Sequence, residues 1–491
     1  MHELTCPIDA IGPKRVLACW ATDRENLNQL VWPMVGLAGG LLAIFESTPT
    51  AVAWMTCLGG LLAMLRSLSG PLKLPREVYP FAALSMLVLT GFGMALALNY
   101  RSMWGFDFGP NFDDSLYFFR ISQLAAGADL EAFTSFEWVM GGWYCLLSLA
   151  FGRVEHIQLL SMNWAMGAAV AAMAWQLPRS LLSLRCPGWL AILAVLCHVS
   201  YIDSVGHLYR DGLMLLFMMI SLQLASQRHY LWALLPAAGC ATVRAANGII
   251  VVLAIFLLAV SRSRWIHKPG GLFIATVCLL GSLAVADQTI KLGSQLRSLQ
   301  PGPSGGESVT IIERALARGP LMLSQTPGSV DDAQRVAFQI GPAGHLLRPA
   351  LTLFAPFKMA DPRLELTVHH RGVRKFHVDG SLNLLRMTWL NVPIWLITGP
   401  VLILGMVRAW RFSPEARVLL IVFLITLGGL TYVSFQPRHN SALVVLFPCM
   451  MALGWQDDRP AAIRARRVLA GLFLVGITLR NALVLVTGDL G

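Results

Sequence analysis

The chain has 491 residues, of which 56% are hydrophobic and only 13% are charged, whereas soluble domains carry about 25% charged residues. Apolar runs of about 17–25 residues, the length that crosses ~30 Å of hydrocarbon, recur along the whole sequence. These features exclude an ordinary soluble domain and predict an all-α polytopic membrane protein. The formal net charge of +11 does not indicate nucleic acid as a partner, because Lys and Arg collect in short loops, where they orient membrane proteins.

The apolar runs predict transmembrane helices near 28–46, 51–69, 79–98, 157–178, 187–203, 208–226, 230–243, 246–261, 270–287, 388–407, 416–434, 440–455 and 467–487. A further run, 136–151, is shorter and carries Glu137, Trp138 and Trp143. Its length and its aromatic residues are typical of a helix that lies in the membrane interface. The N-terminal segment lacks the apolar core of a signal peptide, so we expect no cleavage there.

Basic loops decide the topology. If 136–151 crosses the membrane, the middle basic loops fall outside, but if it lies in the interface, all of them fall on the cytoplasmic side. We therefore predict about 13 transmembrane helices, with the N-terminus inside and the C-terminus outside. The chain then divides into an N-terminal segment with two helices (1–78), a transmembrane module with a first outer loop at 99–156 (79–287), a large extracytoplasmic loop (288–387) and C-terminal helices (388–491).

The first outer loop contains the stretch GFDFGPNFDDSLYFFR, residues 105–120, which gathers three carboxylates in a chain that is poor in charge. These are Asp107, Asp113 and Asp114, and they are followed by Tyr117 and Arg120. One of Asp113 and Asp114 could be a helix N-cap, but a cap does not require both. The cluster is therefore a candidate functional site.

Short loops on the same predicted outer face carry further polar residues, namely His207, Arg210, Asp211, Arg244, Arg438 and His439. Ionisable groups at membrane depth are costly and usually functional. Structural alternatives remain for several of them. Arg210 and Asp211 could pair with one another or cap a helix, Arg244 could reach lipid headgroups, and the two histidines could be satisfied interfacial residues. Arg438 departs from the positive-inside trend, which favours a function.

Acids and arginines on one outer face fit the transfer of a sugar from a polyprenyl phosphate. Arginines bind a phosphate with fork geometry and stabilise the charge of the leaving group. A carboxylate near the anomeric carbon accepts the proton of the acceptor hydroxyl. The sequence contains no Gly-rich phosphate loop after a strand, so it does not predict a nucleotide-sugar fold.

The order of four stretches resembles the GT-C superfamily of polytopic glycosyltransferases over roughly residues 80–455. The stretches are FDDSLYFFRISQLAAGADLE, WYCLLSLAFGRVEHIQLLSMNWAMG, HLYRDGLMLLFMMISL with TVRAANGIIVVL, and FQPRHNSALVVLFPCMMALGW. They are similar to the acidic pair of the family, its juxtamembrane helix, its Arg-Asp helix start with a later Arg, and the Arg that precedes a late span with an internal Pro. The first two spans are additional to the usual module.

The resemblance implies that Asp113 is the catalytic base, with Asp114 and Asp107 as companions. The family often has Asp-Glu where this chain has Asp113-Asp114, so which of the two is the base stays open. The resemblance also implies that Arg210, Arg244 and Arg438 contact the phosphate. The remaining members of the expected substrate-binding set are Asp211, His207, His439, Arg120 and Tyr117.

The implied partners are a polyprenyl-(di)phosphate-linked sugar donor, a glycan or lipid-linked acceptor, and membrane lipids. The expected location is the bacterial inner membrane, with the site facing the periplasm. Paired carboxylates can hold a divalent cation such as Mg²⁺ or Mn²⁺, but the resemblance does not require one and no metal site is predicted. Wzy- and EpsG-type polysaccharide polymerases share several of these features, including the large outer loop, so a repeat-unit polymerase is an alternative. A transporter or flippase is a more remote one, because it should place charges on broken helices near the midplane.

Overall fold

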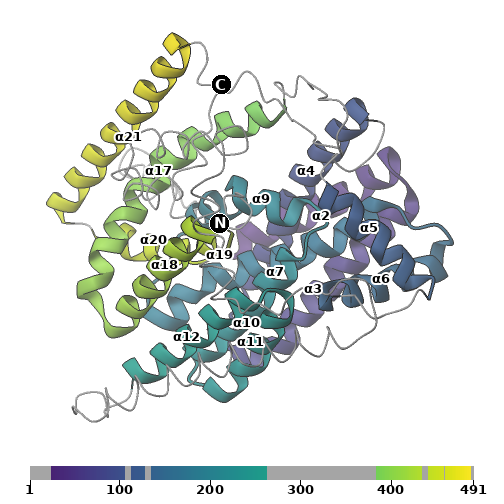
Figure 1. Cartoon of the computed structure of the whole chain (residues 1–491), viewed down its shortest axis with the longest axis horizontal. Coiled ribbons are helices and arrows are strands. Elements are labelled where there is room, and N and C mark those ends of the chain that lie inside the picture. The colour runs from purple at the N-terminus through teal and green to yellow at the C-terminus, as the bar shows by residue number, and fades with distance from the viewer. Residues whose placement is uncertain are drawn as a thin grey trace, which may run out of the picture.

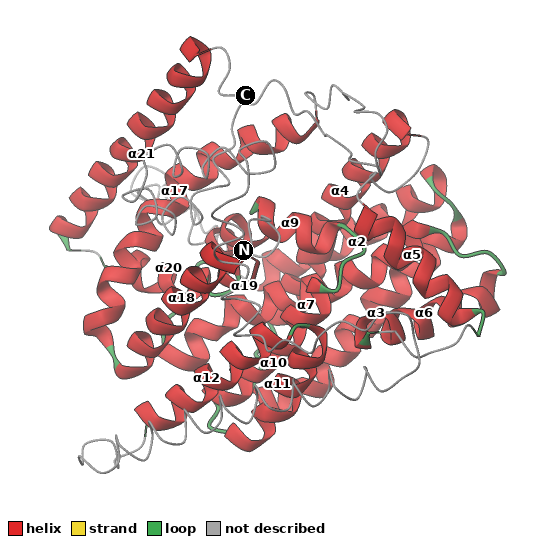
Figure 2. Cartoon of the chain, in the orientation of Figure 1, coloured by secondary structure: helices red, strands yellow, loops and turns green. Residues whose placement is uncertain are grey.

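A computed structural model describes residues 24–104, 112–127, 134–262, 383–433, 441–457 and 459–487. Within these ranges the secondary structure is helical, and Figure 2 shows no strand there. Asp107, the run 270–287, residues 288–382 of the predicted outer loop, and the pair Arg438 and His439 lie outside the described residues.

The N-terminal helices are α2 (Arg24–Phe45), α3 (Thr48–Leu72), α4 (Val78–Trp104), α5 (Phe112–Ala125), α6 (Ser135–Phe151) and α7 (His156–Leu182). They are followed by α8 (Gly188–Ala191), the π-helical turn η2 (Ile192–Leu196), α9 (Val199–Gly206), α10 (Asp211–Ser226), α11 (Tyr230–Val243) and α12 (Ala245–Ser261). The C-terminal helices are α17 (Asn383–Phe412), α18 (Pro414–Val433), α19 (Ser441–Val444), α20 (Phe447–Trp455) and α21 (Pro460–Thr487).

Several of these helices can cross a membrane. Four are long and apolar enough, namely α3, α7, residues 78–98 of α4 and residues 393–412 of α17, and the bent pair formed by α8–η2 and α9 makes a fifth if it is one span. Shorter apolar helices occur at 29–45, 211–226, 230–243, 246–261 and 441–455. The structure therefore agrees with the predicted helical membrane protein. The number of 13 spans stays a prediction.

Helix α7 lies in the middle of the bundle (Figure 1) and is buried along most of its length. Its small residues, in the run AMGAAVAAMA, let neighbouring helices approach closely. Phe81, near the start of α4, stacks on Trp175 with ring centroids 4.4 Å apart. Later in α4, Gly93 lies against Trp164, near the start of α7. Helices α4 and α7 are therefore antiparallel.

Helix α10 runs parallel to α7. Asn163 Nδ2 donates to the His207 carbonyl just before α10, and Gln223 Nε2, near the end of α10, donates to the Met173 carbonyl at 2.8 Å. The bundle therefore has two ends, which we name by one residue each. The Asp211 end carries the starts of α7 and α10. The Arg262 end carries the ends of α7, α10 and α12.

Contacts between distant segments sort by these two ends. At the Asp211 end, Thr50 Oγ1 donates to Glu155 Oε2 at 3.1 Å, and Arg101 Nη2 pairs with Glu46 Oε2 at 2.8 Å. At the Arg262 end, Arg262 Nε pairs with Glu415 Oε1 at 3.1 Å and joins α12 to the start of α18. Each contact joins helix ends that the predicted topology places on one face of the membrane.

Helix α6 begins and ends at the Asp211 end. Ser135 Oγ lies 3.1 Å from Thr242 Oγ1 in the last turn of α11, and the turn after α6 leads to Glu155, the partner of Thr50. Helix α6 therefore does not run from one end of the bundle to the other. Its outer side exposes apolar side chains, among them Leu146 and Leu149. That 136–151 lies in the membrane interface stays a prediction.

Two runs that the sequence predicts as single spans are broken. In 187–203 the chain bends by 66° between η2 and α9. His198 forms the break, because its Nδ1 accepts a hydrogen bond from Ser200 N at 3.2 Å and caps α9. In 440–455 helix α20 restarts next to Pro448, whose ring nitrogen cannot donate a hydrogen bond. The breaks lie close together, since the His198 ring centroid is 5.6 Å from that of Phe447.

Candidate functional site

An ion pair between Asp211 and Arg244 lies at the centre of the candidate site. Asp211 is the first residue of α10, and Arg244 stands in extended conformation between α11 and α12. Arg244 Nη2 lies 2.8 Å from Asp211 Oδ1, and the side chains are 18% and 1% exposed, respectively. A buried carboxylate needs a cationic partner, and the start of a helix also favours a negative charge. Asp211 therefore fixes the position of the Arg244 guanidinium.

The loop before α10 is held in place from α7. Asn163 Nδ2 donates to the carbonyls of Val205, at 3.2 Å, and His207, at 2.5 Å. A Cβ atom at Gly212 would overlap Asn163 Oδ1, so glycine at this position lets the Asn163 side chain keep its place. The buried His207 stacks on Tyr209 with ring centroids 5.1 Å apart. Together these contacts position the start of α10, and with it Arg210 and Asp211.

Helix α5, which carries Asp113 and Asp114 in its first turn, docks on α6 and α7. Tyr117 packs edge-on against Phe136 at 5.4 Å, and Phe118 against His156 at 5.7 Å. Carboxylates in the first turn of a helix are favoured by its dipole. The aromatic contacts therefore bring the acidic start of α5 to the Asp211 end of the bundle.

An ion pair joins the later part of α5 to the start of α6. Arg120 Nε lies 2.5 Å from Glu137 Oε1, and Arg120 Nη2 donates to Glu137 Oε2 at 3.3 Å. Glu137 is 1% exposed and also accepts from the backbone N–H of Thr134 in a capping box. Arg120, which the sequence assigns to substrate binding, thus makes a structural contact that orients α5.

The two ion pairs are linked through α6. The Ser135–Thr242 hydrogen bond joins the start of α6 to the residues just before Arg244. Contacts therefore lead from α5, through α6 and the last turn of α11, to Arg244 and Asp211 without leaving one end of the bundle. His207, Arg210, Asp211 and Arg244 lie around the start of α10, whereas Tyr117 and Arg120 lie on α5 at the same end of the bundle, one helix away across α6.

Helix α19, which follows Arg438 and His439 in the chain, contacts α9 and α10. Sequence reasoning did not identify Asn163 as a support of the site. The Thr-x-x-Glu pattern of residues 134–137 is a capping-box signal that predicts a helix start there. It does not reveal the ion pair with Arg120.

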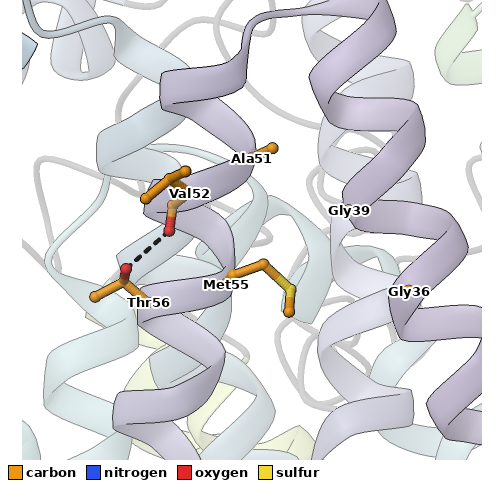
Figure 3. A pocket seen from close by; sticks show the side chains of 6 residues that line it. All are labelled: Gly36, Gly39, Ala51, Val52, Met55 and Thr56. Atoms are coloured by element: carbon orange, nitrogen blue, oxygen red, sulfur yellow. Dashed lines mark hydrogen bonds between the residues drawn. The ribbon is translucent and has the colours of Figure 1, made fainter.

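Metal sites and cavities in the described part of the chain are the remaining candidates for chemistry. There, no three His, Cys, Asp or Glu side chains lie close enough to hold a metal ion. A hollow of about 460 Å³ lies between α2 and α3 (Figure 3), lined by Gly36, Gly39, Ala51, Val52, Met55 and Thr56. The Thr56 hydroxyl donates to the Val52 carbonyl of its own helix at 2.8 Å. The hollow is therefore apolar and carries no catalytic group.

Comparisons of the chain with protein-family models, with curated proteins and with solved structures give no match.

Proposed function

We propose that the protein is an integral membrane glycosyltransferase. It transfers a sugar or glycan from a polyprenyl-(di)phosphate-linked donor to an acceptor hydroxyl in cell-envelope or exopolysaccharide assembly. One observation carries the proposal. The first turn of α5, the start of α10 with Asp211, and the α11–α12 junction with Arg244 lie at one end of an apolar helical bundle, where a lipid-linked donor would present its phosphate.

The charges at the two ends support an extracytoplasmic site. Described basic residues at the Arg262 end include Arg66, Arg76, Arg179, Arg185, Arg228, Arg262, Arg408, Arg411, Arg417, Arg459, Arg464, Arg466 and Arg467. An excess of Lys and Arg marks the cytoplasmic side. In this orientation the Asp211 end faces the periplasm of a bacterial inner membrane. The exposed apolar side of α6 then lies in the interface.

The proposed chemistry divides between the two ion pairs. Asp211 holds Arg244, whose guanidinium binds a phosphate oxygen of the donor and stabilises the negative charge that develops on the leaving phosphate. The Arg120–Glu137 pair orients α5, so that Asp113 or Asp114 accepts the proton of the acceptor hydroxyl. The bond from the anomeric carbon to the phosphate oxygen breaks as the bond to the acceptor oxygen forms. The proton ends on the carboxylate.

A repeat-unit polymerase would use the same acid–arginine site with a longer donor. A flippase is the second candidate, because one observation favours it. The breaks in 187–203 and 440–455 lie side by side, and within the described part of the chain His198 Nε2 is buried without a hydrogen-bond partner. Broken helices and buried ionisable side chains are typical of transport sites.

Transfer in detergent micelles tests the proposal, because a micelle has no two compartments between which a flippase could act. We expect the full-length protein in micelles to convert polyprenyl-phosphate sugars to glycosylated product in the presence of the acceptor. Mass spectrometry of the product separates the addition of one sugar from the addition of repeat units. His198→Phe should keep this activity. Movement of the lipid-linked sugar across vesicles without any product in micelles contradicts the transferase and supports the flippase.

A further inference from the structure

Helix α21 presents a stripe that is charged at one end and apolar along the rest. Figure 1 shows α21 at the edge of the molecule beside α17, and Phe473 packs against Gly399 of α17. Arg464 and Arg467 are exposed near its start. Residues spaced by three or four share one helix face, and this spacing continues through the exposed side chains of Val468, Leu472 and Val475.

Among the described residues, no acid pairs with the two exposed arginines at the start of α21. The helix contains no Asp or Glu, and its N-terminal dipole adds further positive potential. Arg464 and Arg467 make no ion pair within the described part of the chain. The neighbouring acid Asp457 already pairs with Arg459, and this hydrogen bond lowers the pKa of Asp457 to about 2. An external anion is therefore favoured here.

The apolar part of the stripe decides between occupants. A soluble anion would use the two arginines and leave Val468, Leu472 and Val475 uncovered. A second copy of α21 would bring arginines against arginines, and α21 offers no acid to pair with them. A phospholipid with an anionic headgroup matches both parts, since its acyl chains cover the apolar side chains while its phosphate lies at the arginines. Basic clusters at membrane helix ends recruit such lipids.

We propose that α21 binds an anionic phospholipid, with the headgroup between Arg464 and Arg467 and an acyl chain along Val468, Leu472 and Val475. This lipid site lies at the Arg262 end, on the opposite side of the bundle from the acid–arginine site, and it does not depend on the transferase activity. The lipid neutralises the start of α21 and fixes the helix relative to the membrane surface.

Native mass spectrometry of the full-length protein tests the lipid site. Detergent-solubilised protein is titrated with phosphatidylglycerol and, in parallel, with phosphatidylcholine. Each arginine near an anionic membrane surface contributes about fivefold in affinity. We therefore expect Arg464→Gln/Arg467→Gln to weaken phosphatidylglycerol binding about 30-fold and to leave phosphatidylcholine binding unchanged. The matched control is Arg66→Gln/Arg179→Gln, which removes two exposed arginines elsewhere at the Arg262 end and should keep the wild-type affinity.

Three results overturn the lipid site. One is equal binding of the two lipids by the wild type, and another is unchanged phosphatidylglycerol affinity in the Arg464→Gln/Arg467→Gln variant. The third is displacement of the lipid by inorganic phosphate at the same concentration. The acyl-chain contacts should make the lipid bind more tightly than free phosphate, so such displacement would show that they contribute nothing. Both double variants must melt at the wild-type temperature in micelles. If the α21 variant melts lower, the single variants Arg464→Gln and Arg467→Gln take its place, each with an expected loss of about fivefold.

Discussion

Removing Asp211 and removing Arg244 should lower the free energy of unfolding by different amounts. Removing one partner of a buried pair costs about 3–5 kcal/mol when the other charge stays buried. Arg244→Met keeps the apolar stem but leaves a carboxylate that is 1% exposed, so we expect a loss of about 3 kcal/mol. Asp211→Asn leaves a guanidinium that is 18% exposed and can be hydrated. For this variant we expect a loss of about 1 kcal/mol, the scale of one hydrogen bond.

The double variant Asp211→Asn/Arg244→Met contains neither charge. It should lose about 1–2 kcal/mol in free energy of unfolding, which is less than the loss expected for Arg244→Met alone. The sum of the single losses would then exceed the double loss by about 2–3 kcal/mol, a coupling within the range for contacting residues. Reversible unfolding of the full-length protein in SDS mixed micelles measures all four forms. Equal losses for the two single variants, or additive losses in the double variant, refute the account of a buried carboxylate held by a solvent-reaching arginine.

Three further predictions concern the rest of the bundle. Gly405→Val in α17 should lower the free energy of unfolding by about 2 kcal/mol or more, because a Cβ there overlaps a backbone carbonyl of α20. The control Gly428→Val in α18 meets open space and should leave stability unchanged. Equal melting temperatures of the two variants would contradict this prediction. Glu137→Gln keeps an acceptor for the capping box but removes the ion pair with α5, so hydrogen exchange should accelerate in α5 and not in α7. Burial raises the pKa of Glu415, but a backbone hydrogen bond and contacts with Arg262, which follows α12, and with Ser413 outweigh burial and lower the pKa below its ordinary value. The ionised carboxylate stabilises the fold, so stability is lost as the pH falls from the ordinary pKa of a glutamate to below the lowered pKa. Over this range the melting temperature of the wild type should fall more than that of Glu415→Gln. An equal fall in both proteins would contradict the prediction.

Uninterrupted apolar runs predicted most helices, because the apolar length needed to cross a membrane is visible in the sequence. The run 230–243 coincides with α11, and 157–178 lies within α7. Helix starts were less accurate. Helix α21 begins at Pro460 rather than at 467, because the arginine-rich turn before the apolar run is also helical and Pro is tolerated at the first position.

The breaks within 187–203 and 440–455 could not be predicted from apolarity, because each run as a whole is apolar enough and long enough to be read as one span. At His198 the decisive event is one side-chain hydrogen bond that caps α9 and replaces the continuing helix. In 440–455 Pro448 gave a signal, but proline is tolerated inside membrane helices, and α11 and α17 both contain it.

The candidate site shows the same limit. The sequence placed Asp211 and Arg244 in separate outer loops but could not pair them, since pairing depends on how α10 and α11 pack. Likewise, Arg120 and Glu137 were visible as charges, whereas their contact is set by the docking of α5 on α6. The acidic stretch at 105–120 was found because three carboxylates stand out in a chain with few charges.

The transfer rate of Asp113→Asn tests the central claim most directly. Removing a general base costs about 10²–10⁴-fold in rate, so the full-length variant in micelles should lose at least about 100-fold in transfer while it still binds the lipid-linked donor and melts as the wild type does. Asp114→Asn, measured beside it, identifies which aspartate is the base. Glu77→Gln, which removes a carboxylate at the Arg262 end, should transfer at the wild-type rate. Wild-type transfer by both aspartate variants contradicts the claim that the acidic start of α5 carries the chemistry.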